Sequence, residues 1–162
     1  MATTTLDIKR TTINLAPESL GDNHWSAASG DELSIRKQRH THRLVLPLTD
    51  GSDVAAISQI VHAAKAKGKI VAVEVTPNVA PLGAYKWTAD VKKSTAGGAF
   101  ASILVTTEDV DSNSVDRTPQ AVALAVTTYG DDDVFQIVVT ISGASGTKGQ
   151  GGCIILWLDE EP

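Results

Sequence analysis

The sequence predicts a mainly β protein, a sandwich or barrel of short antiparallel strands with one short helix near its start. Two observations carry this prediction. After residue 68 the chain alternates between short apolar segments and turn-forming residues, which is the spacing of a sandwich or barrel. Aromatic residues make up 4% of a chain that is 42% hydrophobic, so Val, Ile, Leu and Ala must supply the core. The length, 162 residues, is that of one domain.

The first predicted strand is "HRLVLPLTDG", residues 42–51. Leu44, Leu46 and Leu48 alternate with other residues, as in a strand with one buried face. Pro47 indicates that this strand lies near a sheet edge or is about to end, because proline has no backbone N–H to donate.

The next segment, "SDVAAISQIVHAAKAKGK" at residues 52–69, predicts the helix. Val54, Ile57, Val61 and Ala64 recur at intervals of three and four residues and would form one apolar stripe. Gly68 could end the helix. His62 lies beside the stripe and is expected to be an ordinary boundary side chain.

The remaining predicted strands follow in order. "KIVAVEVTP" alternates strictly, with Val71, Val73 and Val75 expected on one face and Ile70 on the other. The later strand segments are "AYKWTADV", "GGAFASILVTT", "QAVALAVTT", "DVFQIVVTISG" and "CIILWLD". The last two are joined by "GASGTKGQGG", which is expected to be a flexible hairpin connection.

Residues 1–32 are polar and show no sustained period, so they are predicted to be a partly ordered N-terminal arm, and residues 33–162 to be the folded domain. The start of the chain has no apolar core region after a basic one, so no signal peptide is expected. No apolar run approaches the roughly 18 residues of a membrane span, so no membrane partner is expected. The single cysteine, Cys153, is expected to be a small buried hydrophobe in a reducing compartment.

Charge is divided unevenly along the chain. Up to Lys93 there are 12 Lys and Arg against 9 Asp and Glu, and from Ser94 onward 2 against 10, giving net charges of +3 and -8. This asymmetry favours a polyanion on one side and solvent, cations or a partner on the other. The acidic runs at residues 131–133 and 159–162 are expected to be solvated, or to meet cations or basic residues across a subunit contact.

Three motifs begin like a metal or phosphate-binding site but lack residues that the full pattern requires. His40 and His42 would share one face of an extended segment, but no carboxylate follows nearby to complete a metal site. "DVDSNSVDRTPQ" begins like a calcium loop, yet Ser114 replaces the turn glycine and Gln120 the bidentate glutamate. "GASGTKGQGG" lacks the Gly-Lys-Ser/Thr ending of a phosphate loop. We therefore predict no enzyme, no metal and no cofactor.

The basic segment "IRKQRHTHR", residues 35–43, has two interpretations. Its cations either protect a strand edge from aggregation or contact nucleic-acid phosphate. His40 and His42 would gain charge only near their ordinary pKa of about 6.5. The candidate nucleic-acid-binding residues, including two in the N-terminal arm, are Lys9, Arg10, Arg36, Lys37, Arg39, His40, His42 and Arg43. Binding by charge would be weak and non-specific.

The order of these elements, from about residue 39 to residue 159, resembles the coat proteins of small icosahedral positive-strand RNA plant viruses, the tymovirus-like group above all. Pro77, Pro81 and Trp87 carry part of the resemblance. It implies an eight-stranded antiparallel jelly-roll sandwich whose copies close into an icosahedral shell around single-stranded RNA. The arm and residues 36–43 would then face the genome.

The expected protein is accordingly a self-assembling structural capsid protein of the virion, assembled in the host cytoplasm, with itself and RNA as partners. The chain is shorter than is typical of that group, and its arm lacks a dense basic run. The alternative is a stand-alone β-sandwich binding module, or a phage decoration or tail subunit.

Overall fold

Residues 40–160, the part of the chain that this computed structural model describes, fold into β-strands joined by turns, with no helix among them. The prediction of a mainly β protein is confirmed. The strands are β1 (His40–Asp53), β2 (Ile57–Ala63), β3 (Gly68–Val79), β4 (Leu82–Gly83), β5 (Lys86–Ser94), β6 (Ala101–Ser102), β7 (Glu108–Val110), β8 (Gln120–Val122), β9 (Thr128–Tyr129), β10 (Val134–Ser142), β11 (Gly146–Thr147) and β12 (Gln150–Glu160).

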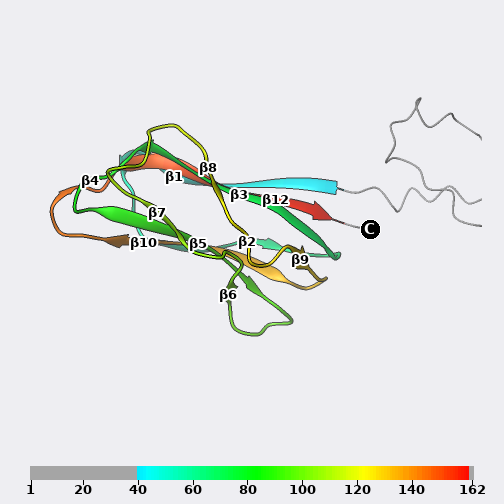
Figure 1. Ribbon diagram of the computed structural model, residues 1–162. Helices are drawn as coiled ribbons and strands as arrows, with labels where there is room; N and C mark the ends of the chain where they lie inside the picture. Colours follow the sequence, from blue (N-terminus) through cyan, green and yellow to red (C-terminus); the bar gives the residue numbers. More distant parts are fainter. Residues whose placement is uncertain (1–39, 161–162) are drawn as a thin grey trace, which may run out of the picture. The chain divides into compact units, whose positions relative to one another are not determined.

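The strands form two antiparallel sheets that lie in two layers (Figure 1). The first sheet has the order β1-β12-β3-β8, with β9 also paired to β3. The second has the order β2-β10-β5-β6, with β7 also paired to β5. A small additional sheet joins β11 to β4. Every strand pairing in the described residues is antiparallel, as predicted.

The core fills the space between the two layers and is built from the alternating positions that face inward. Trp87 and Phe135 from the second sheet are fully buried, and so are Leu156 and Leu158 from the first. Burial of each large aliphatic or aromatic side chain contributes roughly 1.5–3 kcal/mol. The two layers are therefore held together by apolar packing, as the composition predicts.

One side of the sandwich is closed by backbone hydrogen bonds between the layers. Leu104 and Leu124 form an isolated antiparallel bridge, and the Ala125 N–H donates to the Ile103 carbonyl at 2.8 Å. On the opposite side β1 and β2 are the terminal strands of their sheets. Within residues 40–160, β1 pairs with β12 alone and β2 with β10 alone. The open side of the sandwich is therefore lined by two strand edges.

The helix predicted for residues 52–69 is wrong, because Ile57–Ala63 forms strand β2 against β10. Ile57 and Val61 are four residues apart, and an even spacing places two residues on the same face of a strand as well as of a helix. Both pack against the core. Val54 and Ala64 are buried outside the strand, and their N–H groups donate to the carbonyls of Gly149 and Asp133.

The strict alternation predicted for residues 69–77 is interrupted once. The register between β12 and β3 shifts so that Trp157 pairs with Ala72 and Leu158 with Ile70, which leaves Val71 as the extra residue of a bulge. Ile70 is therefore buried, and Val71 is 57% exposed. The predicted boundary between residues 32 and 33 lies outside the described residues. The described chain contains no helix long and apolar enough to cross a membrane.

Candidate functional site

The structure describes three of the eight candidate nucleic-acid-binding residues, and all three belong to strand β1. These are His40, His42 and Arg43. The other five lie outside the described residues: Lys9, Arg10, Arg36, Lys37 and Arg39. The interface predicted from the basic segment can therefore be examined at its C-terminal end.

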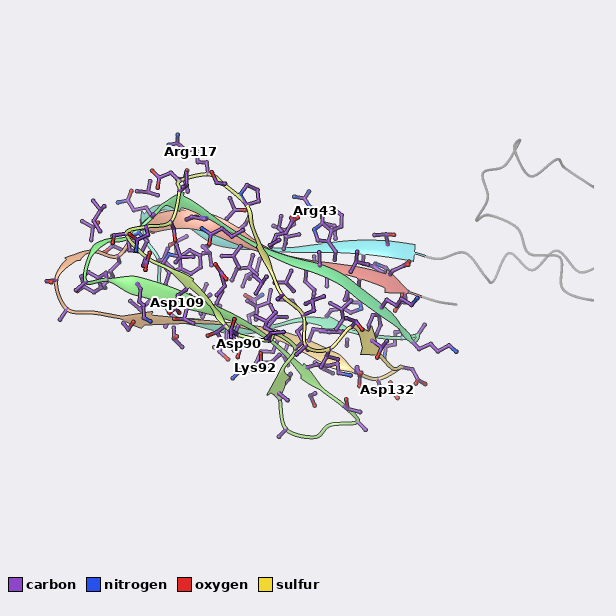
Figure 2. All side chains as sticks on the ribbon, viewed as in Figure 1. Arg43, Asp90, Lys92, Asp109, Arg117 and Asp132 are labelled. Carbon is purple, nitrogen blue, oxygen red and sulfur yellow. The ribbon has the colours of Figure 1, made fainter. Side chains whose placement is uncertain are left out.

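Strand geometry separates His42 from Arg43. His42 is opposite Leu158, which is fully buried in the core, and Arg43 is opposite Trp157 on the outer face of the first sheet. Neighbouring residues of a strand point to opposite faces. Figure 2 shows Arg43 directed away from the second sheet. His42 and Arg43 thus do not contribute to one continuous basic surface.

On the outer face, Arg43 lies over an aromatic ring. Its guanidinium carbon is 5.4 Å from the centroid of the Trp157 ring, within the range of a cation–π interaction. The Trp157 indole Nε1–H donates to Glu74 Oε2 at 3.3 Å. A cation and a carboxylate therefore both contact the same half-buried indole, and the carboxylate offsets the positive charge that phosphate contact would need.

On the other side of β1, His42 belongs to a cluster of aromatic and histidine rings at the open side of the sandwich. His42 Nε2 lies 2.9 Å from Glu160 Oε2 on β12. The His42 and His62 ring centroids are 5.8 Å apart, and that of His62 is 6.1 Å from the Phe135 ring. Since β1 and β12 belong to one sheet and β2 to the other, these contacts connect the two layers.

The helix predicted for residues 52–69 did not place His62 in this cluster. The Nε2 of His62 is buried and has no hydrogen-bond partner within the described structure. Burial lowers the pKa of His62, with nearby Glu160 opposing the shift and His42 adding to it. We therefore expect His62 to stay neutral at pH values at which an exposed histidine is partly protonated.

Tyr129 extends the cluster into the core. Its ring packs edge-on against Phe135 with centroids 5.4 Å apart, and its hydroxyl is buried without a hydrogen-bond partner in the described part of the chain. Burial, together with Glu160 and Asp159, raises the pKa of Tyr129 to about 12. The tyrosine remains neutral at any physiological pH.

The acidic segments that the sequence singled out have structural partners. Asp109 accepts hydrogen bonds from Lys86 Nζ at 2.6 Å and Thr88 Oγ1 at 2.5 Å, and these bonds lower its pKa. Asp111 Oδ1 accepts the Asn113 backbone N–H at 2.8 Å, as in an Asx turn. The segment that begins like a calcium loop is thus a hydrogen-bonded turn.

The acidic run at residues 131–133 is only partly solvated. Asp131 and Asp132 are exposed, whereas Asp133 is 1% exposed and pairs with Lys93 inside the same chain. The glycine-rich segment, residues 143–152, also differs from the expected hairpin, because β10 and β12 belong to different sheets. Its β11 instead pairs with β4. Among the described residues, no three His, Cys, Asp or Glu side chains are grouped to hold a metal ion.

No protein-family model matches the chain, and no curated protein matches it at a significant level. The geometry of residues 40–160 and the residues that carry the resemblance are therefore the basis for a functional proposal.

Proposed function

We propose that this protein is a structural coat subunit with a jelly-roll fold, and that its copies assemble into an icosahedral shell around single-stranded RNA. The structural observation that supports the fold in this proposal is the strand order. The small sheet of β4 and β11 is set aside, β6 and β7 are counted as one strand, and β8 and β9 are counted as another. The eight principal strands that result, numbered 1 to 8 along the chain, form sheets of order 1-8-3-6 and 2-7-4-5.

This order is what results when a long antiparallel ribbon rolls up. The ribbon pairs strand 1 with 8, 2 with 7, 3 with 6 and 4 with 5, and all four pairings occur among the described strands. The two-sheet jelly roll is a common architecture of viral capsid domains, although it also occurs in lectins and cupins. Strand order thus supports the fold that the resemblance implies, while the shell function rests on the resemblance itself.

Two further properties favour assembly. The open side leaves the edges of β1 and β2 without a partner strand within the described domain, and closed symmetric assembly is one way to cover such edges. The formal net charge of -5 means that shell formation does not depend on neutralising a large basic excess with RNA. We therefore expect protein contacts to suffice for assembly, and RNA binding to be weak and salt-sensitive.

The test is particle size, measured by negative-stain microscopy and light scattering on purified protein at neutral pH and low salt, with and without nuclease. Uniform spheres tens of nanometres across (roughly the size set by many copies of a small domain), including empty ones, would support the proposal. A stable monomer under all conditions would favour a stand-alone binding module, and a small ring would favour a phage decoration or tail subunit.

RNA packaging needs a separate measurement. In the proposed shell, Arg36, Lys37 and Arg39 contact phosphate, and their replacement by Gln should lower the RNA content of purified particles without preventing particle formation. Particles with unchanged RNA content would contradict the assignment of these residues to the RNA interface. The control is Arg117→Gln, which removes one exposed cation from a turn far along the sequence.

A further inference from the structure

The two sheets of the sandwich have outer faces of different chemistry. On the outer face of the second sheet, β5, β6 and β7 carry polar side chains that are hydrogen-bonded from strand to strand, and Ile60 on β2 is exposed. Lys86 and Thr88 both bond to Asp109 on β7, and Ser102 Oγ donates to Asp90 Oδ1 at 2.6 Å. Figure 2 shows Asp90 and Lys92 on this lower layer. This face has the composition expected of a sheet surface in contact with water.

The outer face of the first sheet is largely apolar. The β1–β12–β3 register places its residues in three adjacent rows: Arg43, Trp157 and Ala72; Val45, Ile155 and Glu74; and Pro47, Cys153 and Thr76. Val45 is 46% exposed, and Val71 adds a further apolar side chain at the bulge, 57% exposed. Ile155 in the middle row is 7% exposed, so the exposed apolar surface comes from its neighbours Val45, Pro47 and Val71. A contiguous exposed apolar area is a common feature of interaction sites.

We propose that this outer face of the β1–β12–β3 sheet, defined by the three rows and Val71, binds the same face of a second copy of the chain. The inference rests on the proposed function, because self-assembly makes a second copy the natural partner. It goes beyond that function by naming the contact surface and the residues that pair across it.

Charge complementarity is the reason for choosing a second copy. Arg43 is on β1 and Glu74 is on β3, so the cation and the anion flank the central strand from opposite sides and in adjacent rows. Trp157 lies between them and contacts both, through the cation–π interaction and the hydrogen bond. The face therefore carries opposite charges on either side of an apolar centre.

This arrangement matches itself after a two-fold rotation. An axis that is parallel to the sheet, perpendicular to the line from Arg43 to Glu74, and passes between Ile155 and Trp157 exchanges the positions of Arg43 and Glu74. When two faces meet across that axis, Arg43 of each copy lies over Glu74 of the other, and the apolar side chains meet in the middle. An interface of this isologous kind is the usual arrangement in symmetric dimers, and a buried apolar centre with paired charges around it is typical of stable contacts.

The test uses charge reversal in the full-length chain, followed by sedimentation velocity and microscopy of nuclease-treated protein. Arg43→Glu would place two acidic groups together across the axis, and Glu74→Arg two basic ones. Each variant should weaken self-association by more than about tenfold, because juxtaposed like charges disfavour binding. A mixture of the two variants restores both opposite-charge contacts and should recover association.

The apolar centre has a matched control. Val71 on the first sheet and Leu82 on β4 are both 57% exposed. Val71→Lys should reduce association, whereas Leu82→Lys should leave it unchanged. Thermal unfolding of every variant establishes that the domain is folded.

The possible outcomes separate this inference from the proposed function. Recovery in the mixture supports the inference, and it does so even if the wild type stops at dimers and forms no shell. Particles that survive both charge reversals overturn the inference and leave the coat function standing. Weakening without recovery in the mixture would mean that Arg43 and Glu74 act within one copy, through Trp157. Unaltered association combined with lost RNA binding would make this face an RNA interface and would also overturn the inference.

Discussion

The ion pair between Lys93 and Asp133 is the most informative place to perturb the fold. Lys93 Nζ lies 2.6 Å from Asp133 Oδ2, and the two side chains are 18% and 2% exposed. The same carboxylate oxygen accepts the Gly130 backbone N–H at 2.9 Å. Burial by itself would raise the pKa of Asp133, but the bonds from Lys93 and Gly130 outweigh it, and the pKa is lowered.

Replacing Lys93 by Met keeps an unbranched aliphatic chain and removes the ammonium group. Asp133 would then be a buried anion held by the Gly130 backbone N–H and the Thr95 side chain, without a cation. Breaking a buried pair in this way costs about 3–5 kcal/mol of the free energy of unfolding. For a domain of this size the loss corresponds to a fall of roughly 10–20 °C in melting temperature. The assay is guanidinium unfolding at pH 7, followed by the fluorescence of the fully buried Trp87.

Three comparisons test the reasoning. Lys92→Met, which removes an ammonium 3.6 Å from Asp90 on the more exposed face, should cost less than about 1 kcal/mol. Adding Asp133→Asn to Lys93→Met should recover part of the stability, since no buried charge is left unpaired. Because the pKa of Asp133 is lowered on folding, the wild-type advantage should be full above about pH 3.8 and should shrink as the pH falls further. A loss below about 1 kcal/mol for Lys93→Met at pH 7 would refute the buried-pair interpretation.

Three other predictions concern the cluster at the open side. Gly68→Ala should destabilise the domain by about 1–3 kcal/mol, because the added Cβ would collide with the Asp159 carbonyl and the Tyr129 ring. Gly130→Ala is the control and should be nearly neutral in the same denaturant assay, because its Cβ would meet nothing within 4 Å. Absorbance titration should show one tyrosine ionising only near pH 12, and Tyr129→Phe should abolish that step without loss of stability, because it removes a buried hydroxyl that has no partner in the described structure. The pKa of His62 is lowered on folding, so the unfolded state binds a proton first and stability should fall as the pH drops below about 6.5; His62→Phe should flatten the dependence of the urea midpoint on pH between about 7.5 and 5.5, and an unchanged slope would contradict the assignment.

Alternation along the chain predicted the long strands because a sheet with one buried face imposes a period of two on its sequence. The strands predicted at residues 97–107 and 120–128 are mostly not strand: they contain the two-residue β6, the three-residue β8 and the first residue of β9. The segments around Leu46, Trp87, Ile137 and Leu156 all lie in strands with buried side chains at alternate positions. The same rule failed at Val71, where a bulge shifts the period by one residue. Bulges depend on the partner strand, and local sequence does not reveal the partner.

The helix prediction failed for a related reason. Ile57 and Val61 satisfy helix and strand periods equally, and the choice was made by the unpaired edge of β10, which β2 covers. Tertiary pairing of this kind overrides local propensity. A regular strand with Ile57 and Val61 facing the core would direct His62 outward. The register shift at Val61 instead places His62 opposite Phe135 and near His42, so neither a helix nor a regular strand predicts the cluster.

One signal of the buried ion pair was present in the sequence. Trp87, Ala89, Val91 and Lys93 occupy alternate positions of β5, and the first three are buried in the core. A lysine that continues an apolar face needs a buried acidic partner or a route to solvent. The run at residues 131–133 offered three acidic candidates, but only the strand register, with Lys93 opposite Phe135, identifies Asp133 as the partner.

The position of Arg43 makes contact between copies and contact with RNA phosphate mutually exclusive for this residue of the basic segment. An arginine that lies over Trp157 on the outer face and faces Glu74 of a second copy is not free to contact phosphate in the assembled state. If copies meet through this face, the RNA contacts of the proposed shell must come from cations before residue 40. Arg43→Gln should then change assembly while leaving the RNA content of each particle formed unaltered, whereas substitution of Arg36, Lys37 and Arg39 should do the opposite. Equal effects of both sets on RNA content would show that the segment acts as one surface despite the alternation of the strand.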